Sequence, residues 1–158
     1  MAIISTDIQY RLSGGASNAV TASSLGGVKS SVAASNYFDD VSSAEAGTGD
    51  TEYRCIYVHN NHGTLSLIGA KVFIQTNTPS SDTDVTIGLG SSAINGTEQT
   101  VADESAAPTG VSFSAPTTFA GGLAIGDLAA GAHKAVWVRR TVNAGAAAYA
   151  DSFTLRVQ

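Results

Sequence analysis

The stretch EYRCIYVHN, residues 52–60, decides the fold. Successive side chains of a β-strand point to opposite faces of a sheet, so Cys55 and Tyr57 share one face while Ile56 and Val58 share the other. Both faces are largely apolar. Because a strand that is exposed on one side alternates between apolar and polar residues, this pattern predicts a central strand covered on both sides.

Further short apolar segments surround this strand, separated by Gly, Asn, Asp and Pro residues that favour turns. They lie at residues 8–12, 71–75, 85–89, 111–113, 123–125, 133–142 and 153–157. No segment combines a 3.6-residue apolar period with helix caps. We therefore expect an all-β fold, an immunoglobulin-like or jelly-roll antiparallel β-sandwich over residues 51–158, with Trp137 in its core.

Residues 1–50 differ in composition from the rest of the chain. The tract SGGASNAVTASSLGGVKSSVAASN, residues 13–36, holds few large apolar side chains. Burial of so little apolar surface cannot offset about 1–2 kcal/mol of backbone entropy per ordered residue. We expect residues 1–50 to form an extended N-terminal arm that is ordered on a partner chain. The residues expected to bind the partner are Ile8, Tyr10, Arg11, Leu12, Leu25 and Val28.

Composition excludes several function classes. The formal net charge is −5, and eight Lys and Arg residues are spread along 158 positions, which argues against nucleic-acid binding. No apolar run approaches the ~18 residues of a membrane span. Residues 1–12 lack the features of a secretory signal. The lone Cys55 excludes an internal disulfide.

The residues that carry chemistry form no recognised catalytic or metal pattern. His59 and His62 have the spacing of a metal pair, but Cys55 would lie about 13 Å from His59 along the strand. No Gly-x-Ser-x-Gly elbow is present. The carboxylate pairs in predicted loops lack the spacing of a calcium loop. We expect a non-enzymatic protein with no catalytic residue, cofactor or metal ion.

Two resemblances add to these patterns. YRCIYVHNNHGTLSLIGAKVFIQT, residues 53–76, and LAIGDLAAGAHKAVWVRR, residues 123–140, resemble bacterial immunoglobulin-like adhesion domains. The whole chain, including YRLSGGASN at 10–18 and SLGGVK at 24–29, resembles small structural proteins encoded in the virion gene clusters of tailed bacteriophages. The first resemblance bears on the fold and says little about function.

The second resemblance implies a virion component. Such a protein would be a capsid decoration (cement) protein that binds the major capsid protein or other virion proteins. It would act as a homotrimer on the capsid surface, after assembly in the host cytoplasm. A tail, neck or baseplate module is the first alternative. A module that binds cell-surface carbohydrate is the second, with Tyr10, Tyr37 and Tyr149 as candidate surface aromatic residues.

Overall fold

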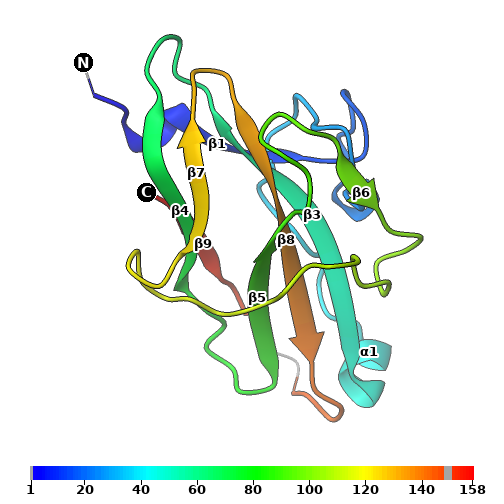
Figure 1. Cartoon of the computed structure of the whole chain (residues 1–158). Helices are drawn as coiled ribbons and strands as arrows, with labels where there is room; N and C mark the ends of the chain where they lie inside the picture. Colours follow the sequence, from blue (N-terminus) through cyan, green and yellow to red (C-terminus); the bar gives the residue numbers. More distant parts are fainter. Residues whose placement is uncertain (1, 148–150) are drawn as a thin grey trace.

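The computed structural model describes residues 2–147 and 151–158, and strands dominate them (Figure 1). The main sheet has the order β1-β3-β8-β5, formed by Ile8–Leu12, Asp50–Asn60, His133–Val142 and Thr83–Leu89. The second sheet has the order β7-β4-β9, formed by Leu123–Leu128, Leu67–Thr76 and Thr154–Val157. A small third sheet joins β2, Gly26–Gly27, to β6, Glu98–Thr100. All strand pairs are antiparallel, which confirms the predicted all-β class.

Strands β3 and β8 form the centre of the main sheet. Their register runs from Asp50 opposite Val142 to His59 opposite His133. Ile56 of β3 is fully buried on the face toward the second sheet, and Cys55 is fully buried on the opposite face. The prediction of a strand covered on both sides is therefore confirmed.

The two faces of the main sheet belong to two separate hydrophobic cores. The first core lies between the main and second sheets and contains Ile56, Val58, Ala70, Val72, Ile74, Val85, Ile87, Ile125, Leu128, Ala132, Val136, Val138 and Leu155. The second core covers the opposite face and contains Tyr53, Cys55, Tyr57, Ala135 and Trp137. Trp137 thus fills the second core and not the space between the sheets, because its neighbours Val136 and Val138 occupy the inner face of β8.

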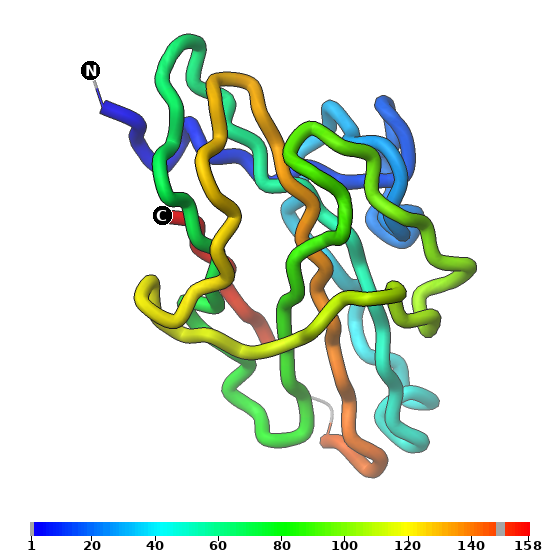
Figure 2. The backbone as a smooth tube through the Cα atoms, in the orientation of Figure 1, coloured from blue at the N-terminus to red at the C-terminus, as the bar shows by residue number. Residues whose placement is uncertain are grey.

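An outer layer of irregular chain covers the second core. The chain between β6 and β7 crosses the molecule beside the main sheet (Figure 2). Val111 and Phe113, which we expected in a strand, lie in this segment and pack on the second core. Within the described residues, neither of them pairs with a strand. The residue after Phe113, Ser114, forms an isolated β-bridge with Ile87.

The helical content is small. The end of the segment expected as an extended arm contains the helix α1, Ser43–Thr48. Ser42 and Glu45 cap it reciprocally: the Ser42 hydroxyl accepts from the Glu45 N–H at 3.2 Å, and the Glu45 carboxylate accepts from the Ser42 N–H at 2.6 Å. Two single 3₁₀ turns, η1 at Ser5–Asp7 and η2 at Thr21–Ser23, complete the described helical residues. No helix in the described part of the chain has the length and apolar character needed to cross a membrane.

The N-terminal segment differs from the expected arm. Strand β1 is part of the main sheet and pairs with β3 from Ile8 opposite Asn60 to Leu12 opposite Ile56. Residues 30–34 cover its other edge. The Leu12 N–H donates to the Val32 carbonyl at 3.1 Å, and other backbone hydrogen bonds join the same two segments on either side of this one. The alternation of apolar residues in β1 places one face on the first core, so this segment uses its own domain as a surface.

Candidate functional site

The six residues predicted to bind a partner differ in exposure: one is buried, four are half-buried and one is exposed. Leu12 is buried, and Ile8 and Tyr10 pack against the first core. The Tyr10 hydroxyl donates to the Leu155 carbonyl at 3.3 Å, and Arg11 donates to the Ser31 carbonyl and the Gln9 side chain.

The β1–β3 ladder places these four residues in the sheet and not on a free arm. Their binding to a partner stays a prediction. Leu25 is half-buried. Only Val28 is strongly exposed, at 49%.

Residues 13–31, named here the N-terminal cap, fold over the outer edge of β3. Buried hydroxyl groups hold the cap in place of large apolar side chains. The Ser13 hydroxyl donates to the Cys55 carbonyl at 2.7 Å and accepts from the Gly26 N–H at 3.1 Å. The Cys55 N–H donates to the Ser24 carbonyl at 2.7 Å. The cap is therefore ordered by hydrogen bonds to its own sheet, a signal that apolar patterning does not report.

The outward face of the cap carries small side chains and little charge. Lys29 is the only charged residue of the cap. Val20 is 57% exposed and Val28 is 49% exposed. The loop that carries Ile94, which is 37% exposed, lies beside the cap. The Tyr57 hydroxyl joins the two, because it lies 2.6 Å from the Gly27 carbonyl of the cap and 3.5 Å from the Gly96 carbonyl of the loop. The cap therefore presents a partly apolar surface with a single charged residue to solvent.

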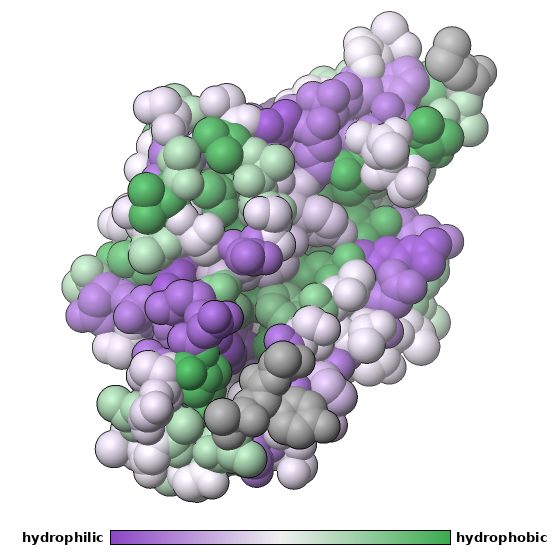
Figure 3. All heavy atoms as spheres, turned by 180° about the vertical axis from the view of Figure 1, so that it is seen from behind, coloured by the Kyte–Doolittle hydropathy of each residue, from purple (hydrophilic) through white to green (hydrophobic). Residues whose placement is uncertain are grey.

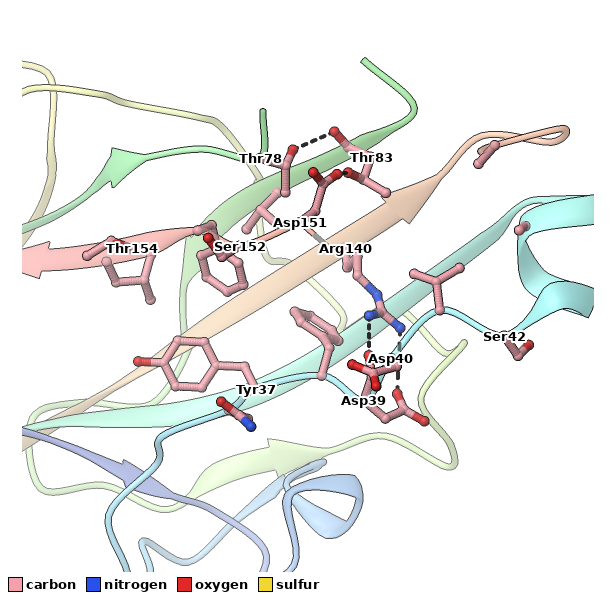
Figure 4. Close-up of a pocket in the computed structure, with 18 of the residues that line it drawn as sticks. Tyr37, Asp39, Asp40, Ser42, Thr78, Thr83, Arg140, Asp151, Ser152 and Thr154 are labelled. Carbon is pink, nitrogen blue, oxygen red and sulfur yellow. Dashed lines mark hydrogen bonds and ion pairs between the residues drawn. The ribbon is translucent and has the colours of Figure 1, made fainter. Parts of the chain in front are cut away.

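A hollow of about 1130 Å³ opens on the other side of the main sheet. Its walls are residues 35–47 and 151–155, and its floor includes Val85 and Arg140. From behind, apolar side chains are visible in a recess with polar side chains along its border (Figure 3). The polar residues come from several elements, with Arg140 pointing from β8 toward Asp39 and Asp40 (Figure 4).

The two ends of the hollow differ in how their polar groups are engaged. Asp151 accepts hydrogen bonds from the Thr83 hydroxyl and, at 3.3 Å, from the Ser80 N–H. Asp40 is exposed and has no hydrogen bond or ion pair with the described residues. The rings of Tyr37 and Phe153, whose centroids are 5.6 Å apart, also line the hollow. Aromatic rings and a free carboxylate in one hollow suit a ligand rich in hydroxyl groups.

A buried charge network lies under the hollow. The Arg140 Nε donates to Glu52 at 2.7 Å, and an Arg54 nitrogen lies 3.6 Å from the other Glu52 oxygen. Arg54 also donates to Glu104 at 2.5 Å. The Phe38 ring packs against both guanidinium groups, at 4.9 Å from Arg140 and 5.5 Å from Arg54.

Each buried charge in this network thus has an opposite charge beside it, as a buried ion pair requires. Burial raises the pKa of Glu52, and the two guanidinium groups oppose that rise. These groups are already engaged with one another, so the network is structural.

The described residues hold no arrangement typical of a nucleophile with its base. Burial raises the pKa of the Cys55 thiol well above its ordinary value, which keeps it protonated and unreactive. One group of carboxylates, Glu45, Asp50 and Glu52, has oxygens within 4.8 Å of one another. Glu52 is the partner of Arg140, so its oxygens are taken.

The described residues of the hollow and the cap form hydrogen-bond networks, and they include no nucleophile paired with a base. Tyr37 is half-buried against Phe153, Tyr10 is bonded inside the fold, and Tyr149 lies outside the described residues. Comparison of the chain with protein-family models, with curated protein sequences and with solved structures finds no match.

Proposed function

We propose that this chain is a non-enzymatic structural protein of a tailed-bacteriophage virion, a capsid decoration protein that stabilises the head by binding across major capsid protein subunits. Its two larger sheets would form an immunoglobulin-like or jelly-roll β-sandwich. The subunits would assemble as a homotrimer on the capsid surface, after synthesis in the host cytoplasm. The resemblance of residues 10–18 and 24–29 to small virion proteins supports this proposal.

The observation that carries the proposal is the N-terminal cap. It includes both of those stretches from Ser13 onward, it exposes Val20 and Val28, and it has one charge. A surface with few charges and small side chains loses little solvation when another protein covers it. The same residues are held to β3 by backbone hydrogen bonds, so binding would not require the ordering of a flexible arm.

The energy available from such a contact is modest for each subunit and large when symmetry repeats it. Burial of roughly 200–400 Å² of apolar surface contributes about 5–10 kcal/mol before the cost of association. Because every capsomer would make the same contact, the sum would resist internal pressure on the shell.

Binding to particles tests the role of the cap. Val20→Asp and Val28→Asp place a charge on the cap, and Ile68→Asp is the matched control, because Ile68 is 70% exposed on β4 of the second sheet. We expect all three variants to melt like the wild type. We expect the two cap variants to lose at least about tenfold in occupancy on particles that lack the protein, and Ile68→Asp to bind fully.

Three results would count against the proposal. Full occupancy by both cap variants would exclude the cap as the contact. Absence of the chain from purified particles by mass spectrometry would exclude a virion role. A few dozen copies per particle would favour a tail, neck or baseplate module, whereas hundreds of copies would favour the shell.

The hollow favours a second candidate, a module that binds cell-surface carbohydrate. Tyr37 and Phe153 supply aromatic surface, and the carboxylates of Asp40 and Asp151 supply acceptors for sugar hydroxyl groups. A glycan array tests this candidate with Asp40→Asn as the variant. Binding that is weaker in Asp40→Asn and normal in Val28→Asp would favour carbohydrate recognition over the capsid role, and an array without hits would exclude it.

A further inference from the structure

Basic side chains gather on the outer face of the main sheet, next to the N-terminal cap. They are Arg11 of β1, Lys29 of the cap, His59 of β3 and His133 of β8. We propose that this basic cluster binds a small oxyanion, a single carboxylate or phosphate group. The proposal concerns the free protein and does not rest on a virion role.

The sheet register places the four residues together. His59 lies directly opposite His133, with their ring centroids 6.4 Å apart. Arg11 lies opposite Tyr57, whose ring is 5.2 Å from that of His133. The backbone after Lys29 is fixed to β1, because the Ser30 N–H donates to the Leu12 carbonyl at 2.8 Å. The backbone before Lys29 is fixed within the cap, because the Gly15 N–H donates to the Val28 carbonyl at 3.1 Å.

The basic cluster has no counter-charge among the residues that the structure describes. None of its four residues forms an ion pair within the described part of the chain, whereas Arg54 and Arg140 both face Glu52. Two buried nitrogen atoms in the cluster, Arg11 Nε and His59 Nδ1, have no hydrogen-bond partner there. Buried polar atoms in native proteins are almost always paired, so these two atoms have room for a further hydrogen-bond partner, and Arg11 Nε requires an acceptor.

The electrostatics of the cluster agree with this geometry. Burial lowers the pKa of His59, and Lys29 and Arg11 lower it further, whereas hydrogen bonds with the Ala132 backbone and the Asn61 side chain partly oppose this shift. Burial lowers the pKa of His133 as well, followed by the effects of Lys29 and His59. Lys29 itself has a lowered pKa, from burial and then from Arg11.

An acidic residue, Glu98, is joined to the cluster by a hydrogen bond, but its carboxylate is already engaged elsewhere. Glu98 joins the cluster through its N–H, which donates to the Tyr57 hydroxyl at 3.0 Å. Its carboxylate accepts from the N–H and hydroxyl of Ser91 and from the N–H of Ser92, at 2.9–3.1 Å. No carboxylate is among the groups that shift the pKa of His59 or His133. An incoming oxyanion would therefore supply both the negative charge and the acceptor atoms that the cluster lacks.

The same observations limit the size of the ligand. The four residues form one compact cluster and not a stripe, and the chain as a whole has a net charge of −5. A polyanion would meet repulsion outside the cluster, whereas one carboxylate or phosphate group would not.

The experiment follows the imidazole signals of His59 and His133 by NMR in the intact chain. Inorganic phosphate is titrated at constant ionic strength with sodium chloride, and acetate is titrated in a parallel series. We expect saturable shifts confined to the cluster and a rise of about one in both imidazole pKa values, because an anion stabilises the protonated ring.

Variants separate this site from general charge effects. Lys29→Gln should weaken the binding about tenfold without loss of fold, because it removes one charged donor from a half-buried position. Lys71→Gln is the control, since Lys71 lies on β4 and donates to the Ala120 carbonyl at 3.2 Å. Shifts with phosphate but not acetate would identify a phosphate site, and the reverse a carboxylate site. Shifts no larger than those with chloride, or equal in Lys29→Gln and the wild type, would overturn the proposal.

Discussion

Truncation of Leu12 tests whether the N-terminal strand is part of its own domain. Leu12 ends β1 opposite Ile56 and is only 2% exposed. Removal of a buried leucine side chain to alanine costs about 2–5 kcal/mol, from lost burial and the cavity left behind. Because Leu12 lies in an edge strand that can relax, we expect about 3 kcal/mol for Leu12→Ala. Val28→Ala is the matched control, since Val28 is 49% exposed and should change the free energy of unfolding by less than about 0.5 kcal/mol.

Urea denaturation followed by the fluorescence of Trp137 measures this difference, because Trp137 is fully buried in the second core. With a slope of about 1–3 kcal/mol per molar urea, a loss of 3 kcal/mol lowers the midpoint by about 1–3 M. The melting temperature should fall by about 6–12 °C. Sedimentation at two protein concentrations must show a monomer in both variants. Contact between Leu12 and a second copy of the chain then cannot account for the difference in the free energy of unfolding. Equal stability of Leu12→Ala and Val28→Ala would refute the placement of β1 in the sheet.

Three further predictions concern single residues. Burial alone would raise the pKa of Glu98, but hydrogen bonds from Ser92 and Ser91 outweigh it and lower the pKa from 4.5 to about 2. Its stabilising effect is therefore present above pH 4.5 and lost as the pH falls toward 2, and acid denaturation of Glu98→Gln should lack this component. Gly26→Ala should destabilise the fold more than Gly131→Ala in thermal melts. Both glycines have a positive φ. However, a Cβ at Gly26 would lie 1.8 Å from the Gln99 carbonyl oxygen, whereas a Cβ at Gly131 would meet nothing within 4 Å. Cys55 should react with a thiol reagent only after unfolding, and rapid labelling of the native protein would contradict its burial.

The sequence was most informative where side chains alternate strongly. The predicted strands at 52–60 and 133–142 correspond to β3, Asp50–Asn60, and β8, His133–Val142. Alternation also identified the strand at Ile8–Leu12. It did not identify which surface that strand would cover, because an apolar face fits its own sheet as well as a partner's.

The missed features depend on contacts between residues far apart in the chain. The cap is held by buried serine hydroxyls such as that of Ser13, and a serine in a Gly-rich tract is more typical of an exposed turn. Alternation along one strand also does not indicate that β3 brings Glu52 opposite Arg140, where the pair is buried. The basic cluster likewise needs the register of three strands to bring His59, His133 and Arg11 together.

The position of the main sheet between two cores has a consequence for local opening. Amide protons in the middle of β8, such as that of Val138, lie between β3 and β5 and beneath apolar layers on both faces. They should exchange with deuterium only when the whole molecule unfolds. The outer layer at residues 13–31 and 101–114 rests on one face alone, so its amides should exchange through smaller, independent openings. That layer can therefore accept insertions and changes of sequence while the paired sheets beneath it keep their structure.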